Sequence, residues 1–235
     1  MADGAGDDRD LLADQIRYYE DRADIYEKLY ERRDEYDLGP EGNARWFVAT
    51  SILESSIKSL RADGSVLEIA CGTGLWTRWL APRASRLLCV DTSPRMLQRN
   101  RELVGDGEID YVLADVFEWD PGESFDVIVM GFFVSHIPPD RFAGFWDRVR
   151  RWLDREGIVW FCDDSAGPDR PRTGDRMPGV PHAHRRRLGG REYTIVKVFY
   201  GPEELEVKLN GLGWEADVRA AGEDLLYGTA KARTV

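Results

Sequence analysis

Histidine, cysteine and lysine are scarce in this chain of 235 residues, which has three histidines, three cysteines and five lysines. The cysteines, Cys71, Cys89 and Cys162, are scattered and odd in number, which predicts buried thiols in a reducing compartment and no disulfide framework. No apolar run approaches the roughly 18–20 residues needed to span a bilayer. The N-terminus also lacks the basic start and apolar core of a secretory signal. We therefore expect a cytoplasmic protein that does not bind membranes.

Positive charge is outnumbered as well. The 43 acidic side chains exceed the 32 basic ones, so the formal net charge is −11. This balance argues against a nucleic-acid partner, because binding a phosphate backbone over a broad surface needs clustered Lys and Arg. Hydrophobic residues make up 43% of the chain, enough for a packed core, and the length suits one domain with additions.

The chain changes its pattern near residue 64. Before it, residues 8–34 and 43–60 carry apolar side chains at helical spacing, and the first helix is expected to break near Asp24. After it, short apolar runs alternate with helical stretches, which predicts a mostly parallel sheet covered by helices on both faces. The expected strands are 65–70, 86–90, 109–113, 125–130, 158–162, 192–200, 214–220 and 225–231, and the expected helices are 75–82, 94–104, 140–154 and one opening at 201. Residues 164–190 are rich in Pro, Gly and Arg, which predicts a long loop.

The most specific stretch is an apolar strand that runs into a Gly-x-Gly turn. Gly72 and Gly74 would let the backbone turn sharply and approach a ligand closely. Asp91 ends the next expected strand, where a carboxylate can bind both hydroxyls of a ribose. The third glycine of the dinucleotide fingerprint is missing, because Thr77 stands in its place. These features by themselves fit a nicotinamide dinucleotide or an adenosyl ligand.

Glu68 inside the first strand, followed by Ala70-Cys71-Gly72-Thr73-Gly74, resembles the leading motif of the class I S-adenosylmethionine-dependent methyltransferases of the small-molecule type. The resemblance continues in order over roughly residues 64–163. It is carried further by 91–97, 113–116, 125–132 and 152–158. It implies a Rossmann-like α/β fold: a seven-stranded, mostly parallel sheet with an antiparallel C-terminal hairpin, helices on both faces and an N-terminal helical cap. The cap would span 1–63 and the methyltransferase core 64–235, with 164–190 as a loop insert.

The resemblance also implies S-adenosylmethionine as the cofactor. Asp91 would bind the ribose, Met96 would lie against adenine and Asp115 would reach the exocyclic amine. Tyr19 and Tyr26 resemble the aromatic cap that shields the cofactor in many members, although both could instead pack the helix onto the sheet. The expected cofactor-binding residues are Tyr19, Tyr26, Glu68, Ala70, Gly72, Gly74, Asp91, Thr92, Met96, Ala114, Asp115, Val116 and Gly131.

His136 follows the fourth expected strand, in the loop that borders cofactor and acceptor in this family. A histidine suits proton removal near neutral pH, so His136 is the expected catalytic base, with a helix cap or a loop filler as the alternative. The expected acceptor contacts are Phe132, Phe133, Asp163 and Asp164. No metal is expected, because catechol-type metal sites place an acid at the end of the fourth strand, where this chain has Gly131.

These residues predict a methyltransferase that acts on a small organic acceptor, with O-methylation slightly favoured over N or C. Residues 165–191 carry seven Arg and two Asp, which leaves room for an anionic acceptor. The same charges would also fit a solvated loop, or a patch that pairs with the acidic N-terminal helix. Arg outnumbers Lys 27 to 5, as in GC-rich bacterial genomes, which favours a role in bacterial specialised metabolism.

Three other functions stay open at this point. One is an S-adenosylmethionine-using enzyme of the same fold that catalyses cyclisation, elimination or halide methylation. Another is a non-catalytic cofactor-binding partner protein. A nicotinamide-dependent oxidoreductase is disfavoured by Glu68 and Thr77. The protein is expected to be a monomer or a homodimer.

Overall fold

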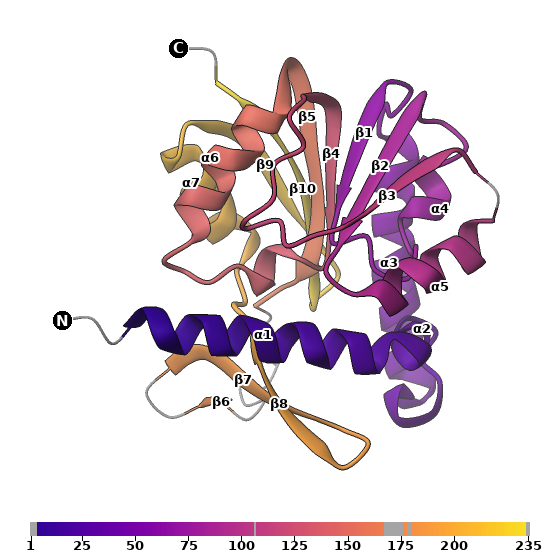
Figure 1. The fold of residues 1–235 in the computed structure, drawn as a ribbon. Coiled ribbons are helices and arrows are strands. Elements are labelled where there is room, and N and C mark those ends of the chain that lie inside the picture. Colours follow the sequence, from indigo (N-terminus) through magenta and orange to yellow (C-terminus); the bar gives the residue numbers. More distant parts are fainter. Residues whose placement is uncertain (1–3, 106, 167–175, 178–179, 234–235) are drawn as a thin grey trace.

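A seven-stranded sheet forms the centre of the computed structural model, which describes residues 4–105, 107–166, 176–177 and 180–233 (Figure 1). The strand order is β3-β2-β1-β4-β5-β10-β9. The strands are β1 (Ser65–Ile69), β2 (Arg86–Asp91), β3 (Ile109–Leu113), β4 (Phe125–Gly131), β5 (Leu153–Asp164), β9 (Trp214–Ala221) and β10 (Leu225–Ala232). Strands β1 to β5 pair in parallel, and β10 pairs antiparallel with β5 and β9. This confirms the predicted mostly parallel sheet with an antiparallel C-terminal hairpin.

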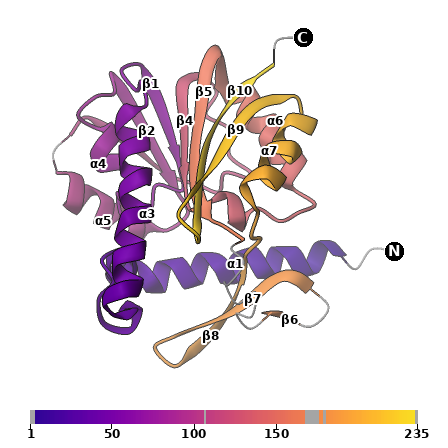
Figure 2. The same ribbon diagram turned by 180° about the vertical axis from the view of Figure 1, so that it is seen from behind.

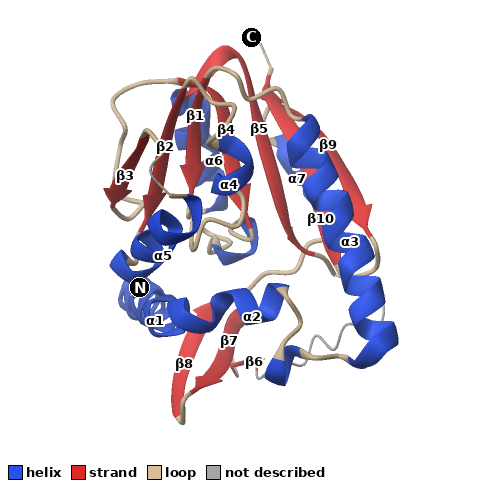
Figure 3. Cartoon of the chain, turned by 90° about the vertical axis from the view of Figure 1, so that its right-hand side faces the viewer, coloured by secondary structure: helices blue, strands red, loops and turns tan. Residues whose placement is uncertain are grey.

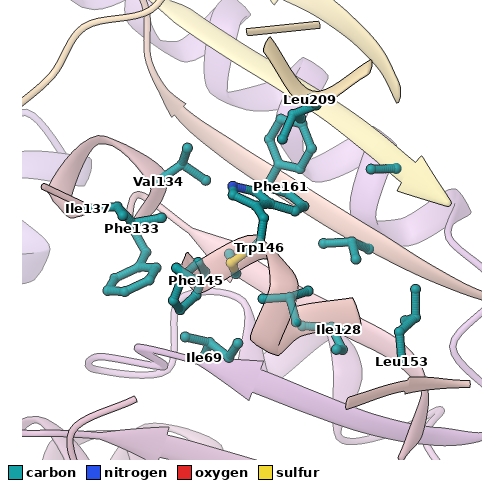
Figure 4. Packing of buried hydrophobic residues seen from close by; sticks show 14 of the residues in the cluster. Ile69, Ile128, Phe133, Val134, Ile137, Phe145, Trp146, Leu153, Phe161 and Leu209 are labelled. Atoms are coloured by element: carbon teal, nitrogen blue, oxygen red, sulfur yellow. The ribbon is translucent and has the colours of Figure 1, made fainter. Parts of the chain in front are cut away.

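Helices cover both faces of this sheet (Figure 2). The helices are α3 (Gly39–Ser59), α4 (Thr77–Leu80) and α5 (Pro94–Val104) on one face, and α6 (Phe142–Trp152) and α7 (Pro202–Gly211) on the other. Along β1, Leu67 packs into the α6–α7 cluster and Val66 into the α3–α5 cluster. Figure 4 shows part of the former cluster, where the rings of Trp146 and Phe161 lie 5.9 Å apart. Apolar side chains on both faces explain why these strands read as continuous apolar runs.

A separate layer, which we call the cover, lies against the carboxyl ends of the strands. It combines α1 (Gly4–Arg22), a 3-10 turn (Ala23–Ile25) and α2 (Tyr26–Tyr30) with a small antiparallel sheet of β6 (Arg176–Met177), β7 (Val180–Leu188) and β8 (Arg191–Val196). Helix α1 runs between the large sheet and the β7–β8 hairpin (Figures 1 and 3). The turn at Ala23–Ile25 confirms the predicted break near Asp24.

The prediction of a loop over 164–190 was wrong for much of the described part, because β7 occupies Val180–Leu188. β7 pairs with β8, and α1 covers the other edge of β8. There Gln15 Oε1 accepts a hydrogen bond from Val196 N–H at 2.9 Å, and the Asp14 carboxylate accepts one from Thr194 N–H. The strand is therefore stabilised by a helix about 180 residues away in sequence, which local composition does not reveal. Residues 167–175 and 178–179 of the predicted loop lie outside the described residues.

Helix α3 buries Leu53 and Ile57 in the core against the sheet, and the part of the chain before α3 contributes to the cover. The division into a cap over 1–63 and a core over 64–235 stays a prediction. Strand β5 begins at Leu153, earlier than predicted, because a register shift between Phe125 and Val127 lets β4 pair with this longer strand. Among the described helices, none is both long and apolar enough to cross a bilayer.

Candidate active site

Two adjoining pockets lie under α1 at the carboxyl ends of β1, β2 and β4, and we call them together the edge cavity. They enclose about 540 and 420 Å³ of space including their open mouths. Both are lined by Gln15, Ile16, Ala70, Asp91, Thr92 and Phe133. The larger, first lobe adds Tyr19, Tyr26, Gly72, Met96, Gly131, Phe132 and His136, and the second lobe adds Leu12, Ala114, Asp115, Val116 and Phe117. Most of the predicted cofactor and acceptor residues thus meet in one place.

Unusual backbone conformations shape the floor of the edge cavity. Ala70 and Phe132 have φ of 52° and 56°, in the left-handed region that residues other than glycine seldom adopt. Gly72 has φ of 53°, which glycine adopts without a steric penalty. A Cβ at Gly131 would lie 2.0 Å from Trp76 Nε1, so only glycine fits there. Strained positions of this kind cluster where a sheet binds a ligand.

Asp91 is held firmly at the junction of the two lobes. Its Oδ2 accepts a hydrogen bond from Gly72 N–H and its Oδ1 one from Ser93 N–H, each at 2.9 Å. Burial raises the pKa of Asp91, and these backbone hydrogen bonds oppose the rise. Asp115 in the second lobe accepts from Phe117 N–H at 2.9 Å. Each carboxylate oxygen can accept more than one hydrogen bond, so both acids can also serve a bound ligand.

Glu68 and Gly74 do not line the edge cavity but support its floor from beneath. Glu68 is 1% exposed and accepts a hydrogen bond from Thr77 Oγ1 at 2.7 Å. Burial raises the pKa of Glu68 to about 8. A Cβ at Gly74 would lie 3.1 Å from the Asn100 side chain, so glycine here lets α5 pack closely on the turn. Thr77 stands where the dinucleotide fingerprint has its third glycine, and its hydroxyl donates the hydrogen bond that Glu68 accepts.

His136 is buried beside the first lobe, and both of its ring nitrogens have partners. Nδ1 lies 2.6 Å from the Val196 carbonyl oxygen, and Nε2 lies 2.8 Å from the Tyr19 hydroxyl. Burial, helped by the charge of Lys197, holds the pKa of His136 well below its usual value. Direct proton removal by His136 would require the Tyr19 hydroxyl to move away first. The general-base role stays a prediction.

Lys197 is the functional-site neighbour that sequence reasoning missed. It is 6% exposed, and its Nζ lies 2.7 Å from Asp164 Oδ2 and 3.3 Å from Asp163 Oδ1. Nζ also donates to Ser135 Oγ at 2.7 Å, and Asp163 accepts from Ser135 N–H at 2.8 Å. The predicted acceptor residues Asp163 and Asp164 are thus absent from the linings of both lobes and pair with this lysine instead. The available signal was a single Lys inside the apolar run Ile195–Val198.

Arg22 is a second buried cation that the sequence did not single out. It is 7% exposed, and its guanidinium lies 5.2–5.5 Å from the ring centroids of Tyr18, Tyr26 and Tyr36. Its Nε has no hydrogen-bond partner within the part of the chain that the structure describes. Across the same residues, no cluster of three or more His, Cys, Asp or Glu could hold a metal ion.

Comparison with known proteins identifies the family. The sequence model of the methyltransferase domain matches residues 66–157. Trans-aconitate 2-methyltransferase of Streptomyces coelicolor is 35% identical over 106 residues, or 41% of this chain and 35% of that relative. The chain thus spans about a third of the length of this curated relative.

Two solved structures match over nearly the full length. The DhpI–SAH complex is 30% identical with a TM-score of 0.76 and covers 97% of this chain and 99% of its own. The DhpI–SAM–HEP complex is 31% identical with a TM-score of 0.76, covering 94% and 98% respectively. The chain belongs to the class I S-adenosylmethionine-dependent methyltransferases. This membership sets aside the nicotinamide-dependent alternative.

The edge cavity of this methyltransferase fits the family's cofactor. In the second lobe, Asp115 and Val116 would hold the adenine, and Asp91 at the junction would hold the ribose. In the first lobe, Gly72 and Gly131 leave the backbone accessible for the methionine part. S-adenosylmethionine supplies a methyl group on a positively charged sulfur. The contacts of individual residues with the cofactor stay predictions.

Proposed function

We propose that this methyltransferase transfers a methyl group to an ionised oxygen of a small organic anion, a carboxylate or a phosphate-type group. The observation that carries this proposal is that buried Arg22 and half-buried Arg186 lack a carboxylate partner among the described residues, while the acceptor side has no free base. Arg22 and Arg186 have no carboxylate within ion-pair distance among the described residues. The charge of Arg186 also acts on the half-buried side chain of Tyr19 and the buried side chain of His136.

A guanidinium suits such an acceptor because its planar fork can donate two parallel hydrogen bonds to a carboxylate or phosphate. A buried cation without a carboxylate partner is also energetically costly, so a bound anion would stabilise Arg22. Arg22 lies over the ring of Tyr26, and Tyr26 lines the first lobe. The positive charge is therefore next to the space where an acceptor would bind.

An ionised oxygen needs no proton removed before it attacks the methyl group, whereas a neutral alcohol or a protonated amine does. This matches a site in which both nitrogens of His136 are hydrogen-bonded and Asp163 and Asp164 pair with Lys197. Alignment of the acceptor with the methyl group and exclusion of water would then supply much of the acceleration. These are tasks for the cavity walls and the cover.

Two of the matched proteins support a small acceptor of this kind. One of them is named for trans-aconitate, which is itself a carboxylate, and DhpI has been solved with SAM and HEP together. A larger polyanion is disfavoured by the net charge of −11. Oxygen as the methylated atom, a cytoplasmic location and a monomeric or homodimeric state stay predictions.

The test is an assay with methyl-labelled S-adenosylmethionine and a panel of small carboxylates, phosphates and phosphonates, phenols and amines. We expect label on an anionic oxygen acceptor and none on the phenols and amines. Transfer confined to amines would contradict the proposal. Label retained on a thioether by-product would identify a cyclisation or elimination enzyme, and cofactor binding without any turnover would favour a non-catalytic partner protein.

A further inference from the structure

Three hydrogen bonds, connected through one turn of α1, join the cover to the loop after β4. Gln15 Oε1 accepts from Val196 N–H at 2.9 Å, and the Val196 carbonyl oxygen lies 2.6 Å from His136 Nδ1. His136 Nε2 lies 2.8 Å from the Tyr19 hydroxyl. Gln15 and Tyr19 are four residues apart and therefore share one face of α1. This chain of hydrogen bonds thus begins and ends on α1, the helix that lines both lobes of the edge cavity.

The chemistry of the groups gives each hydrogen bond a direction. A carbonyl oxygen can only accept, so His136 Nδ1 carries the hydrogen. A neutral imidazole has one N–H, so Nε2 has a lone pair and accepts from the Tyr19 hydroxyl. Burial and the charge of Lys197 keep the ring neutral, because they hold the pKa of His136 well below its usual value. The single hydroxyl hydrogen of Tyr19 is therefore committed to His136.

We propose that His136 orients the Tyr19 hydroxyl so that its oxygen faces the edge cavity only as a hydrogen-bond acceptor, and that this oxygen makes the site prefer S-adenosylmethionine over S-adenosylhomocysteine. Tyr19 is then a specificity residue and His136 a positioning residue. The inference rests on the proposed function only in taking the edge cavity as the cofactor site.

The physical reason is the charge on the cofactor sulfur. The sulfonium of S-adenosylmethionine is positive, and its methyl group shares that charge, whereas the sulfur of the product is neutral. An oxygen lone pair facing a positive group is stabilising in a site shielded from water, and a hydroxyl turned the other way would present its positive hydrogen. Tyr19 is half-buried, and burial raises the pKa of its hydroxyl well above the usual value. Water therefore screens this interaction less than it would at an exposed site.

Isothermal titration calorimetry with the two compounds tests the inference, because it measures binding without turnover. We expect Tyr19→Phe to weaken S-adenosylmethionine binding about tenfold and S-adenosylhomocysteine binding less than about twofold. His136→Ala is expected to change the ratio of the two dissociation constants in the same direction. His136→Gln should keep the ratio within about threefold of wild type, because a carboxamide offers one donor and one acceptor as a neutral imidazole does.

Tyr18→Phe is the matched control. It removes a hydroxyl from the same helix, but Tyr18 packs against Tyr193 and lines neither lobe. The ratio of the two dissociation constants should be the same in Tyr18→Phe as in wild type. Thermal unfolding should show that every variant is folded. Equal weakening of the binding of both compounds by Tyr19→Phe would mean a packing role only and would overturn the inference. Unchanged binding of both compounds would overturn it as well. If His136→Ala does not fold, Tyr19→Phe decides alone. A wild-type chain that binds neither compound would instead overturn the proposed function.

Discussion

The sheet core and the cover are held together by different forces. The core buries two large apolar clusters, one on each face of the sheet. The cover has two small clusters, around Leu11 and Leu12 and around Tyr18 and Tyr193, and depends on hydrogen bonds and ion pairs. The floor of the cofactor site therefore rests on the packed core and is built from nearby sequence. The acceptor side is polar and joins distant segments, so changes at its residues outside the buried Lys197 cluster should alter ligand preference more than folding.

Breaking the junction between cover and core should have the largest effect. Lys197→Met leaves the Asp163 carboxylate, 3% exposed, buried without its cation. We expect a loss of about 3–5 kcal/mol in the free energy of unfolding, measured by urea denaturation at pH 7. The control, Lys231→Met, changes an exposed lysine and should cost less than about 0.5 kcal/mol. Equal losses in the two variants would show that Lys197 contributes no more than a surface residue.

A substitution within the core, Glu68→Gln, should raise the free energy of unfolding, by an amount that depends on pH. The pKa of Glu68 is raised from its ordinary 4.5 to about 8, so between these values the folded state binds more protons than the unfolded state. Stability from this group is therefore lost as pH rises from 4.5 to about 8. Glu68→Gln removes the penalty, and its advantage over wild type should grow to a few kcal/mol between pH 5 and pH 8. Urea denaturation at both pH values measures this, and a pH-independent difference would refute it.

On the acceptor side, neighbouring arginines of β7 should behave differently. Arg186→Ala should raise KM for an anionic acceptor about tenfold, with cofactor affinity unchanged, because a charge-assisted contact with the acceptor is lost. Arg187→Ala should change KM little, because Arg187 is 74% exposed and pairs with Glu192. Arg22→Ala should resemble Arg186→Ala. Steady-state kinetics checks these values, and equal effects at 186 and 187 would argue against a specific anion site.

The smallest effect is expected at the outer contact between cover and core. Asp24→Asn removes the ion pairs with Arg95 and Arg99 of α5. These side chains are exposed, so release of S-adenosylhomocysteine should accelerate less than about threefold. The effect should vanish in about 1 M salt, where charges are screened within about 3 Å. Stopped-flow measurement of release at low and high salt tests this, and an effect that persists at high salt would point to a role other than charge.

The core could be predicted from sequence because its information is local. Apolar runs, the Gly72–Gly74 turn and Asp91 lie within one contiguous stretch, and the resemblance to the methyltransferase family covers that stretch. The family resemblance also predicted Tyr19 and His136 as site residues. In the structure the Tyr19 hydroxyl lies 2.8 Å from His136 Nε2. It did not find β7, because a strand of arginines and histidines is stable only once β8 and α1 lie beside it.

The sequence by itself determined the fold class, the family and the floor of the cofactor site. Only the tertiary structure decided that Asp163 and Asp164 face Lys197 and that His136 has no free nitrogen. The reason is the separation in sequence between the residues that interact. Helical and strand periodicity is written in residues a few positions apart, whereas a hydrogen bond or an ion pair forms only over a few ångströms and here joins residues 33 to 181 positions apart.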